Sequence, residues 1–460
     1  MLEGSDKMFI SNSRKLLQKQ ADELPNQTIN SASFHLTMFL FCPLLALSIL
    51  TSCTNETLKE DSLTSEKSMA IDSSSAPQTL EENLSPEESA TETETKANIN
   101  EQQLNTQAMK IYNALISSLD NENPGFGEET PNGIPSESSM AYAHIAQASA
   151  LVGDTDTMHL SATWLVENPS SNLAMGWGLT FAWDAYGDGS VNPPTTIYGI
   201  TTALAVNGLL ESYCRSGNAN YLEAAVNSLE YYSNHTSVDR YGTYFNYSDQ
   251  SPDAFNTHNV NAMLMLAYAR AGMILNRQDF TQLATEIANS LKLAKKSTSN
   301  SITWPYTAFA EAGTRADRND VVHAAYIAFG ILESQKILDF EIATQKELED
   351  YMNGFLRNGN LKEFRTYEYR NEREDQLRAR GWGLGMYIAW LSSVENYSSG
   401  FEATEMIEDY KTLENTYEYV FGSETAIPRS TSHLLYGVAT LAVEGTSIED
   451  CISTHDFALK

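Results

Sequence analysis

Six stretches of the chain are apolar and rich in alanine, with the apolar positions recurring at helical spacing. Successive stretches begin about 50 to 64 residues apart, near Ser138, Thr195, Asn256, Asn319, Arg380 and Ser430. In the second of them, Pro193 and Pro194 stop any preceding element, and the pattern predicts a helix over about 195–214. A helix that is apolar around most of its surface is buried. We therefore expect six buried helices.

Between these stretches the pattern changes to one apolar face and one charged face, which is typical of helices at a surface. These amphipathic segments lie near residues 104–118, 158–166, 220–232, 279–294, 343–355 and 402–419, and the second is the weakest. No convincing run of alternating apolar and polar residues indicates strands. The expected class is all-α, with an inner and an outer ring of helices.

The repeat length distinguishes two helical architectures. Helical solenoids repeat at about 34 to 47 residues, whereas this chain repeats at about 60, with half of its helices buried on all sides. A closed toroid of six helical hairpins, the (α/α)6 toroid, fits this pattern better. We expect it to span residues 102–460 as one catalytic domain.

The N-terminal part of the chain has a different pattern. Residues 39–50 are almost continuously apolar and are followed by Thr51, Ser52 and Cys53, although the basic residues lie far upstream and Met38 is an alternative start. This segment resembles the lipobox of bacterial lipoproteins, in which the cysteine is acylated after the signal is removed. The resemblance implies a signal in residues 1–53, a lipid anchor on Cys53, and a place in the bacterial cell envelope, at the outer membrane or cell surface. The alternative is a buried segment of a cytosolic protein.

Residues 54–101 are rich in Ser, Thr and Glu and nearly lack aromatics, which predicts a disordered acidic tether. The whole chain has 60 acidic and 29 basic residues and a net charge of −31, which argues against binding to nucleic acid. Two cysteines remain in the predicted domain, Cys214 and Cys451. They can form a disulfide outside the cytosol or stay as two buried thiols.

Unusual polar and aromatic residues gather just before the buried helices. In a toroid, the loops that lead into the inner helices lie at one end, where the positive ends of the helix dipoles point. The catalytic candidates there are His258, Tyr198, Tyr306, His323, Asp320 and Asp184. The substrate-binding candidates are Trp177, Trp183, Asp188, Asn256, Asn259, Arg315, Asp317, Arg380, Trp382, Arg429 and His433.

Each candidate also has a structural interpretation. Asp320 and Asn256 are good helix caps, His323 is compatible with a core histidine, and single tryptophans are often packing residues. Several tryptophans on one rim nevertheless favour stacking on sugars. Arginine is scarce in this acidic chain, and three hairpins place one at equivalent positions, which favours sugars that carry a carboxylate.

The sequence has no signature for a metal or cofactor. It lacks HExxH, paired CxxC, an EF-hand loop, GxGxxG, a P-loop and Gly-x-Ser-x-Gly. The segment DAYGDGS has oxygen ligands that would suit Ca²⁺, as do many turns. We expect neither a cofactor nor a metal.

The alternation of helices resembles the six-hairpin toroid shared by many polysaccharide-active enzymes. The segment YGITTALAVNGLLESYCRSGNANYLEAAVNSLEYY is similar to a helical hairpin of the D-glucuronyl C5-epimerase C-terminal domain. This local likeness implies the fold more strongly than the reaction.

The leading hypothesis is an enzyme on uronate-containing glycans that abstracts the C5 proton, as a lyase or a C5-epimerase. In it, His258 is the base or electrophile. The first alternative is a glycoside hydrolase with Asp184 or Asp188 opposite Asp317 or Asp320. The second is a surface glycan-binding lipoprotein without catalysis. We expect His258, Arg315, Asp320, His323, Arg380 and Arg429 to line one cavity. The oligomeric state is left open.

Overall fold

A computed structural model describes residues 104–130, 133–172, 174–185, 189–297, 301–308, 318–365, 376–442 and 451. The chain divides into two units, Met1–Glu81 and Glu82–Lys460, and all of these residues belong to the second. The predicted signal, Cys53 and the predicted tether lie outside the described residues.

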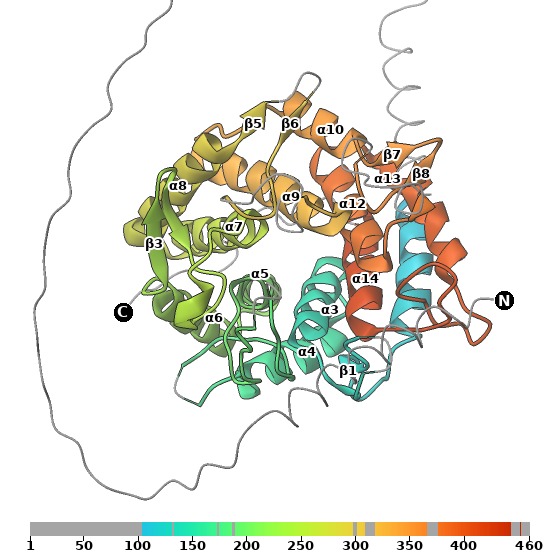
Figure 1. Cartoon of the computed structure of the whole chain (residues 1–460). Helices are drawn as coiled ribbons and strands as arrows, with labels where there is room; N and C mark the ends of the chain where they lie inside the picture. The colour runs from blue at the N-terminus through green and yellow to red at the C-terminus, as the bar shows by residue number, and fades with distance from the viewer. Residues whose placement is uncertain are drawn as a thin grey trace, which may run out of the picture. The chain divides into compact units, whose positions relative to one another are not determined.

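Six helices form a closed inner ring (Figure 1). Each contacts the next one along the chain, and the last contacts the first, which closes the ring. The inner helices are α3 (Ser139–Val152), α5 (Gly199–Ser216), α7 (His258–Leu275), α9 (Val321–Leu338), α12 (Gly381–Ser393) and α14 (Pro428–Ala442). Their apolar residues are buried on nearly every side, as the sequence pattern predicts.

The outer helices alternate with the inner ones along the chain. They are a helix over 104–116, α4 (Thr155–Glu167), α6 (Ala219–Tyr232), α8 (Gln278–Ala294), α10 (Gln345–Asn353) and α13 (Tyr397–Glu405). In α8, for example, Phe280, Ile287 and Leu291 are buried, whereas Gln282 and Glu286 face solvent. Six outer and six inner helices in alternation form an (α/α)6 toroid, which confirms the predicted fold class.

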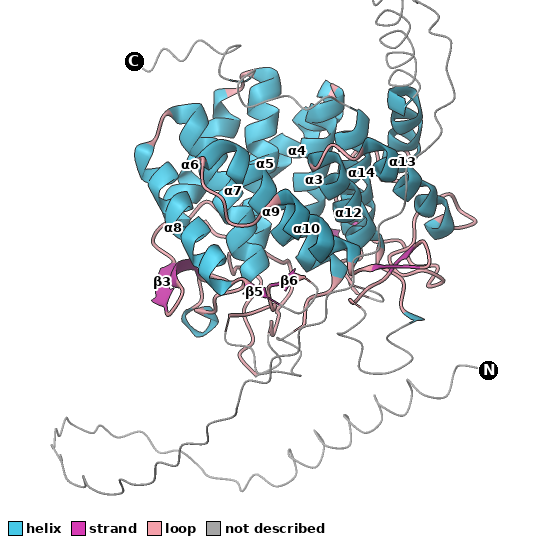
Figure 2. Cartoon of the chain, turned by 90° about the horizontal axis from the view of Figure 1, so that it is seen from above, coloured by secondary structure: helices cyan, strands magenta, loops and turns pink. Residues whose placement is uncertain are grey.

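Four short antiparallel hairpins lie in the connections from an outer helix to the next inner helix. They pair β1 (Phe126–Gly127) with β2 (Ser136–Glu137), β3 (Thr236–Asp239) with β4 (Gly242–Phe245), β5 (Lys296–Ser297) with β6 (Ile302–Thr303), and β7 (Leu356–Arg357) with β8 (Asn360–Leu361). In the longest, Thr236 is opposite Phe245. Strands of two to four residues are too short to show alternation, so the sequence does not predict them. Figure 2 shows the strands gathered at one end of the ring, where the inner helices begin.

Local sequence explains where the inner helices begin and how closely they pack. Ser138 caps α3 by accepting from the backbone N–H of Ala141, and Asp320 caps α9 in the same way. α12 and α14 approach each other through two glycines, since a Cβ added to Gly437 would lie 2.2 Å from the carbonyl oxygen of Gly385. Only glycine allows the two backbones to come this close.

Two predicted boundaries differ from the structure. α5 begins at Gly199 rather than near residue 195, because Tyr198 has an extended backbone and donates its backbone N–H to the carbonyl of Trp177. The helix predicted over 402–419 is wrong over most of its length. α13 ends at Glu405, and a short 3₁₀ helix (Met406–Tyr410) leads into a turn in which Asn415 has a left-handed backbone with φ 62°.

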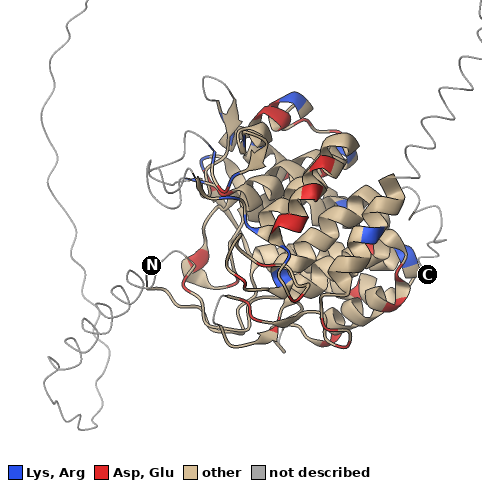
Figure 3. Ribbon diagram, turned by 90° about the vertical axis from the view of Figure 1, so that its right-hand side faces the viewer, with Lys and Arg blue, Asp and Glu red and all other residues tan. Residues whose placement is uncertain are grey.

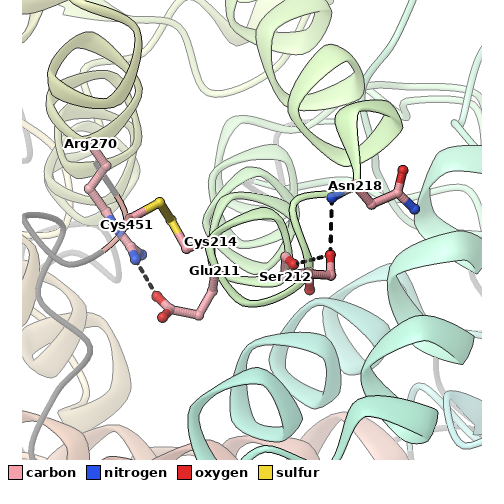
Figure 4. Close-up of a disulfide and its surroundings, with 7 residues drawn as sticks. Glu211, Ser212, Cys214, Asn218, Arg270 and Cys451 are labelled. Carbon is pink, nitrogen blue, oxygen red and sulfur yellow. Dashed lines mark hydrogen bonds and ion pairs between the residues drawn. A yellow bond between two sulfur atoms is a disulfide. The ribbon is translucent and has the colours of Figure 1, made fainter. Parts of the chain in front are cut away.

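The far end of the ring carries a disulfide (Figure 4). Cys214, in the last turn of α5, is bonded to Cys451, with their Cα atoms 4.9 Å apart. This resolves the choice that the sequence leaves open between a disulfide and free thiols. Nearby, Arg270 of α7 forms a buried ion pair with Glu211 of α5. Within the described part of the chain, every helix is too short or too polar to cross a bilayer.

Candidate functional site

An aspartate and a histidine at the start of α9 form a hydrogen-bonded pair at the strand-bearing end. His323 Nδ1 lies 2.6 Å from Asp320 Oδ1, and the same oxygen accepts the backbone N–H of His323 at 3.1 Å. Burial raises the pKa of Asp320, but His323 and Arg380 outweigh it and lower that pKa from 3.8 to about 2. Asp320 is therefore an ionised acceptor for Nδ1–H. Because Nδ1 is engaged, Nε2 is the atom that can exchange a proton with another molecule.

A glutamate that the sequence analysis does not single out lies beside this pair. Glu363 Oε1 is 3.1 Å from Nε of Arg380, the N-cap residue of α12, and Oε2 accepts the Arg380 backbone N–H at 3.0 Å. Burial raises the pKa of Glu363 from 4.5 to about 7; Arg380 opposes this rise and the negative charge of Asp320 adds to it. Two carboxylates thus share one arginine. Asp320, which also has His323, keeps its charge more readily than Glu363.

Aromatic rings lie against Arg380 and Arg429 at this end. The guanidinium of Arg380 lies 5.5 Å from the ring centre of Trp382 and 5.6 Å from that of Tyr419. Arg429 of α14 lies 4.7 Å from the same tryptophan, and its Nη1 is 3.2 Å from Oε2 of the buried Glu129. Trp382 therefore lies near two cations, and the electron-rich face of its ring attracts cations.

Exposure separates the groups that can meet a ligand from those that support them. The side chain of His323 is 27% exposed and that of Arg380 is 34% exposed. The partly exposed residues of this cluster are Tyr306, Asp320, His323, Arg380, Trp382 and Tyr419, which we call the α9/α12 cluster. Glu363, Glu129 and Arg429 lie beneath it with exposures below 10%.

His433 supports the cluster from inside the ring. It is fully buried, its Nδ1 donates to the carbonyl of Arg429 at 2.5 Å, and its Nε2 accepts from the hydroxyl of Tyr326. Burial lowers the pKa of His433 to about 3, so its ring is neutral. The ring packs 6.2 Å from Trp382 and 4.1 Å from the ring of His144. Its place beneath Trp382 gives it a supporting position rather than contact with a ligand.

His258 lies one segment away from the cluster. Its Nδ1 donates to the carbonyl of Pro305 at 2.6 Å, its backbone N–H donates to that of Tyr306, and the Tyr306 ring is 4.9 Å from His323. His258 is 1% exposed, and burial lowers its pKa to about 4. It is a neutral residue that fixes the 305–306 segment against α7.

The remaining candidates around α5 and α7 are mostly buried. Asn256 and Asn259 are 3% and 2% exposed, and Asn256 donates to Asp239 at 2.8 Å. Tyr198 accepts from Asn192 at 3.1 Å, and burial raises its pKa to about 12. These residues connect the start of α5 and α7 to their loops.

The tryptophan-rich loop before α5 contains both buried and partly exposed residues. Trp177 is fully buried and donates its ring N–H to the carbonyl of Leu165 at 3.0 Å, so its ring has no exposed face for a sugar. Trp183 is partly exposed. Asp184, also partly exposed, accepts the backbone N–H of Gly189 at 2.9 Å.

Three predicted site residues, Asp188, Arg315 and Asp317, lie outside the described residues. Of the six residues expected to share a cavity, Asp320, His323 and Arg380 interact directly, Arg429 joins them through Trp382, and His258 through Tyr306. The shared cavity itself stays a prediction. In the described ranges, no three His, Cys, Asp or Glu side chains gather as metal ligands would.

The chain folds as an (α/α)6 toroid, a ring of helical hairpins, with a polar cluster at one end. This fold defines the class of protein. Solved structures with this fold align over most of the chain. They include an α-amylase from Clostridium perfringens (9% identity, 72% of this chain and 96% of that one, TM-score 0.54). A sugar epimerase from a ruminal bacterium aligns over 74% of this chain and 98% of its own, with 13% identity and a TM-score of 0.51.

A glycoside hydrolase family 76 mannosidase from Bacteroides thetaiotaomicron aligns over 74% of this chain and 98% of its own, with 9% identity and a TM-score of 0.51. Such low identities show that the fold is shared and carry nothing about the reaction. Neither the family models nor the curated proteins compared with the sequence match it.

Proposed function

We propose that this protein is a polysaccharide-active enzyme that removes the C5 proton of a uronate residue, with His323 as the base. The observation that carries the proposal is the ionised Asp320 bonded to Nδ1 of a partly exposed His323, with the guanidinium of Arg380 beside them. The enzymes with the same fold that are named above are an α-amylase, a sugar epimerase and a mannosidase, which supports a sugar substrate.

The proposed first step uses three side chains. His323 Nε2 accepts the C5 proton, while the electron pair of the C–H bond moves into the adjacent carboxylate group and forms an enolate. Arg380 places its positive charge against that developing negative charge. Asp320 accepts a hydrogen bond from Nδ1–H and stabilises the imidazolium that forms. A positioned base of this kind contributes about 10² to 10⁴ in rate.

The step can end in two ways. In a lyase, the bond from C4 to the leaving oxygen breaks, a C4–C5 double bond forms, and the oxygen takes a proton from a donor. Tyr306, whose ring lies against His323, is placed to be that donor. In a C5-epimerase, a proton returns to C5 from the opposite face. Both outcomes share the base and the arginine.

This assignment moves the base from His258, which the sequence favours, to His323. His258 is 1% exposed and its Nδ1 is bonded to a backbone carbonyl, whereas His323 is partly exposed and has a carboxylate partner. A base must reach its substrate, directly or through one water. His323 satisfies that condition better.

One observation favours a hydrolase as the second candidate. Asp320 and Glu363 have pKa values pushed apart, to about 2 and about 7, which is the arrangement of a general acid and an ionised carboxylate. Against it, Glu363 is 2% exposed and both of its oxygens face Arg380. A group that donates a proton to a glycosidic oxygen needs contact with that oxygen.

The test of function is to incubate the purified full chain with polymers of galacturonate, mannuronate and glucuronate. Ultraviolet absorbance of a new double bond indicates a lyase, exchange of the C5 proton in D₂O indicates an epimerase, and new reducing ends without a double bond indicate a hydrolase. His323→Ala should lower the rate by about 10² or more. His159→Ala, on outer helix α4, is the matched control. Binding without any product would reject catalysis, and full activity of His323→Ala would reject the base.

We also propose export and a lipid anchor on Cys53. The Cys214–Cys451 disulfide supports this, because disulfides persist in oxidising compartments. A Cys53→Ala protein should lose its association with membranes, which cell fractionation measures. Unchanged fractionation and processing of the variant would contradict the anchor.

A further inference from the structure

Two cations face each other across a bridge beside the α9/α12 cluster. Lys362 follows β8 and pairs with Arg378 in an isolated antiparallel bridge. Side chains directly opposite in such a pair lie about 4.5 to 5.5 Å apart at Cβ, and like charges there are destabilising. In a chain with 60 acidic and only 29 basic residues, this juxtaposition is not a consequence of composition.

The surroundings leave this positive charge only partly neutralised. Arg378 lies 2.8 Å from Asp409 and donates to Asn360 at 2.7 Å. Lys362 has no ion-pair partner among the described residues, and its pKa is lowered by burial and by the positive charges of Arg357 and Arg378. Figure 3 shows basic positions among the loops at the strand-bearing end. Asp409 therefore offsets the charge of Arg378, whereas Lys362 has no carboxylate partner among the described residues; local conflicts of this kind are expected at functional positions.

An exposed aromatic ring accompanies the two cations. The guanidinium of Arg378 lies 4.3 Å from the ring centre of Phe421, which is 48% exposed. A second pair of the same kind lies two residues later in one segment and two residues earlier in the other, where Arg380 lies against Tyr419. Gly381 donates its backbone N–H to the carbonyl of Tyr419, which holds the two segments side by side.

The two arginine–aromatic pairs are therefore neighbours. Residues i and i+2 of an extended segment are about 6.6 Å apart, comparable to the length of one sugar ring. A polymer with a carboxylate on each sugar would meet a cation and a ring face at each pair.

We propose that Lys362, Arg378 and Phe421 form a second binding subsite, which holds an acidic sugar next to the one at Arg380. This inference rests on the proposed function, because it takes the polymer bound at Arg380 to be a uronate glycan. The cations hold the carboxylate, and the exposed ring packs against the apolar face of the sugar. The subsite adds affinity for longer chains.

The test measures the affinity of the purified full chain for galacturonate, mannuronate and glucuronate, from the single sugar acid to the hexamer, by calorimetry. For the series that binds, Arg378→Gln and Lys362→Gln should each weaken binding of the hexamer about three- to tenfold. Binding of the single sugar acid, which fills only the position at Arg380, should change less than twofold, and the losses should shrink as salt is raised. Without ligand, Lys362→Gln should unfold at the same or a higher urea concentration, since it removes a repulsion.

Arg277→Gln is the matched control. Arg277 also lies against an aromatic ring, Phe280 at 4.2 Å, and pairs with Glu230 and Asp279, but it is in the connection between α7 and α8. It should bind both the single sugar acid and the hexamer as the unsubstituted protein does.

Four outcomes decide the inference. A selective loss of hexamer binding without any turnover would support the subsite while the proposed reaction fails. Equal losses for the single sugar acid and the hexamer, or no loss, would overturn the subsite even if the enzyme is active. Equal binding of an uncharged glycan hexamer would also overturn it. Absence of binding to all three uronate series would reject both.

Discussion

Replacing Glu363 by glutamine should change how stability depends on pH. Glu363 is buried against Arg380, and its pKa is raised from 4.5 to about 7. The folded protein therefore binds a proton at Glu363 between these pH values, whereas the unfolded chain has released it. Stability that Glu363 contributes is present below pH 4.5 and is lost as pH rises toward 7. The neutral amide of the Glu363→Gln variant would resemble the protonated form of Glu363 at every pH.

The magnitude follows from the two pKa values. The difference between 4.5 and about 7 corresponds to ~3 kcal/mol of unfolding free energy. Buried histidines act in the opposite direction, because His433 and His258 have pKa values lowered from 6.5 to about 3 and about 4. At low pH these two histidines take up protons only when the protein unfolds, so their contribution to stability falls as pH falls. The informative quantity is therefore the difference between variant and unsubstituted protein, in which the histidine contributions cancel.

Urea unfolding at several pH values from 4.5 to 8 measures this difference. We expect the stability of Glu363→Gln relative to the unsubstituted protein to rise by ~3 kcal/mol across this range. Asp320 does not interfere, because its pKa is lowered to about 2 and its contribution is lost only in stronger acid. A relative stability that stays constant, or falls with pH, would show that Glu363 is ionised in the folded protein throughout.

Two other substitutions test the packing around the ring. Cys451→Ser should lower the unfolding free energy by about 3 to 5 kcal/mol, since the disulfide closes a long loop; urea midpoints measure this, and reductant should destabilise the unsubstituted protein but leave the variant unchanged. His258→Ala should cost about 1 to 3 kcal/mol, because it leaves the carbonyl of Pro305 buried without its donor. His323→Ala, at a partly exposed position, should cost less in the same assay.

The ring could be predicted from the sequence because its period is long and regular. Five of the six inner helices begin within about three residues of the predicted position, since each apolar stripe starts after a cap or a polar loop. The outer helix predicted over 402–419 failed where Asn415 turns the chain, because its apolar residues continue at spacings compatible with a helix. Hairpins of two to four residues have no detectable period.

The candidate site was predictable in part. The sequence singles out Asp320, His323 and Arg380 because they lie at the starts of inner helices, which the fold brings to one end. The sequence does not single out Glu363 and Glu129, because they lie in loop segments. No periodic pattern there indicates which side chains point into the protein. The burial of Trp177 and His258 was also missed, since sequence composition alone does not distinguish a ring that faces the core from one that faces a loop.

The charges of the site are arranged so that one cation stays available. Arg429 is held by Glu129, and Asp320 is held by His323, so these groups largely neutralise each other. Arg380 is shared between Asp320 and Glu363, and of the two carboxylates Glu363 takes up a proton first. Protonation of Glu363 removes a negative charge beside Arg380 while leaving the Asp320–His323 pair intact. If Arg380 binds an acidic ligand as proposed, protonation of Glu363 should increase the positive charge that Arg380 offers to it, without changing the residues proposed to move the proton.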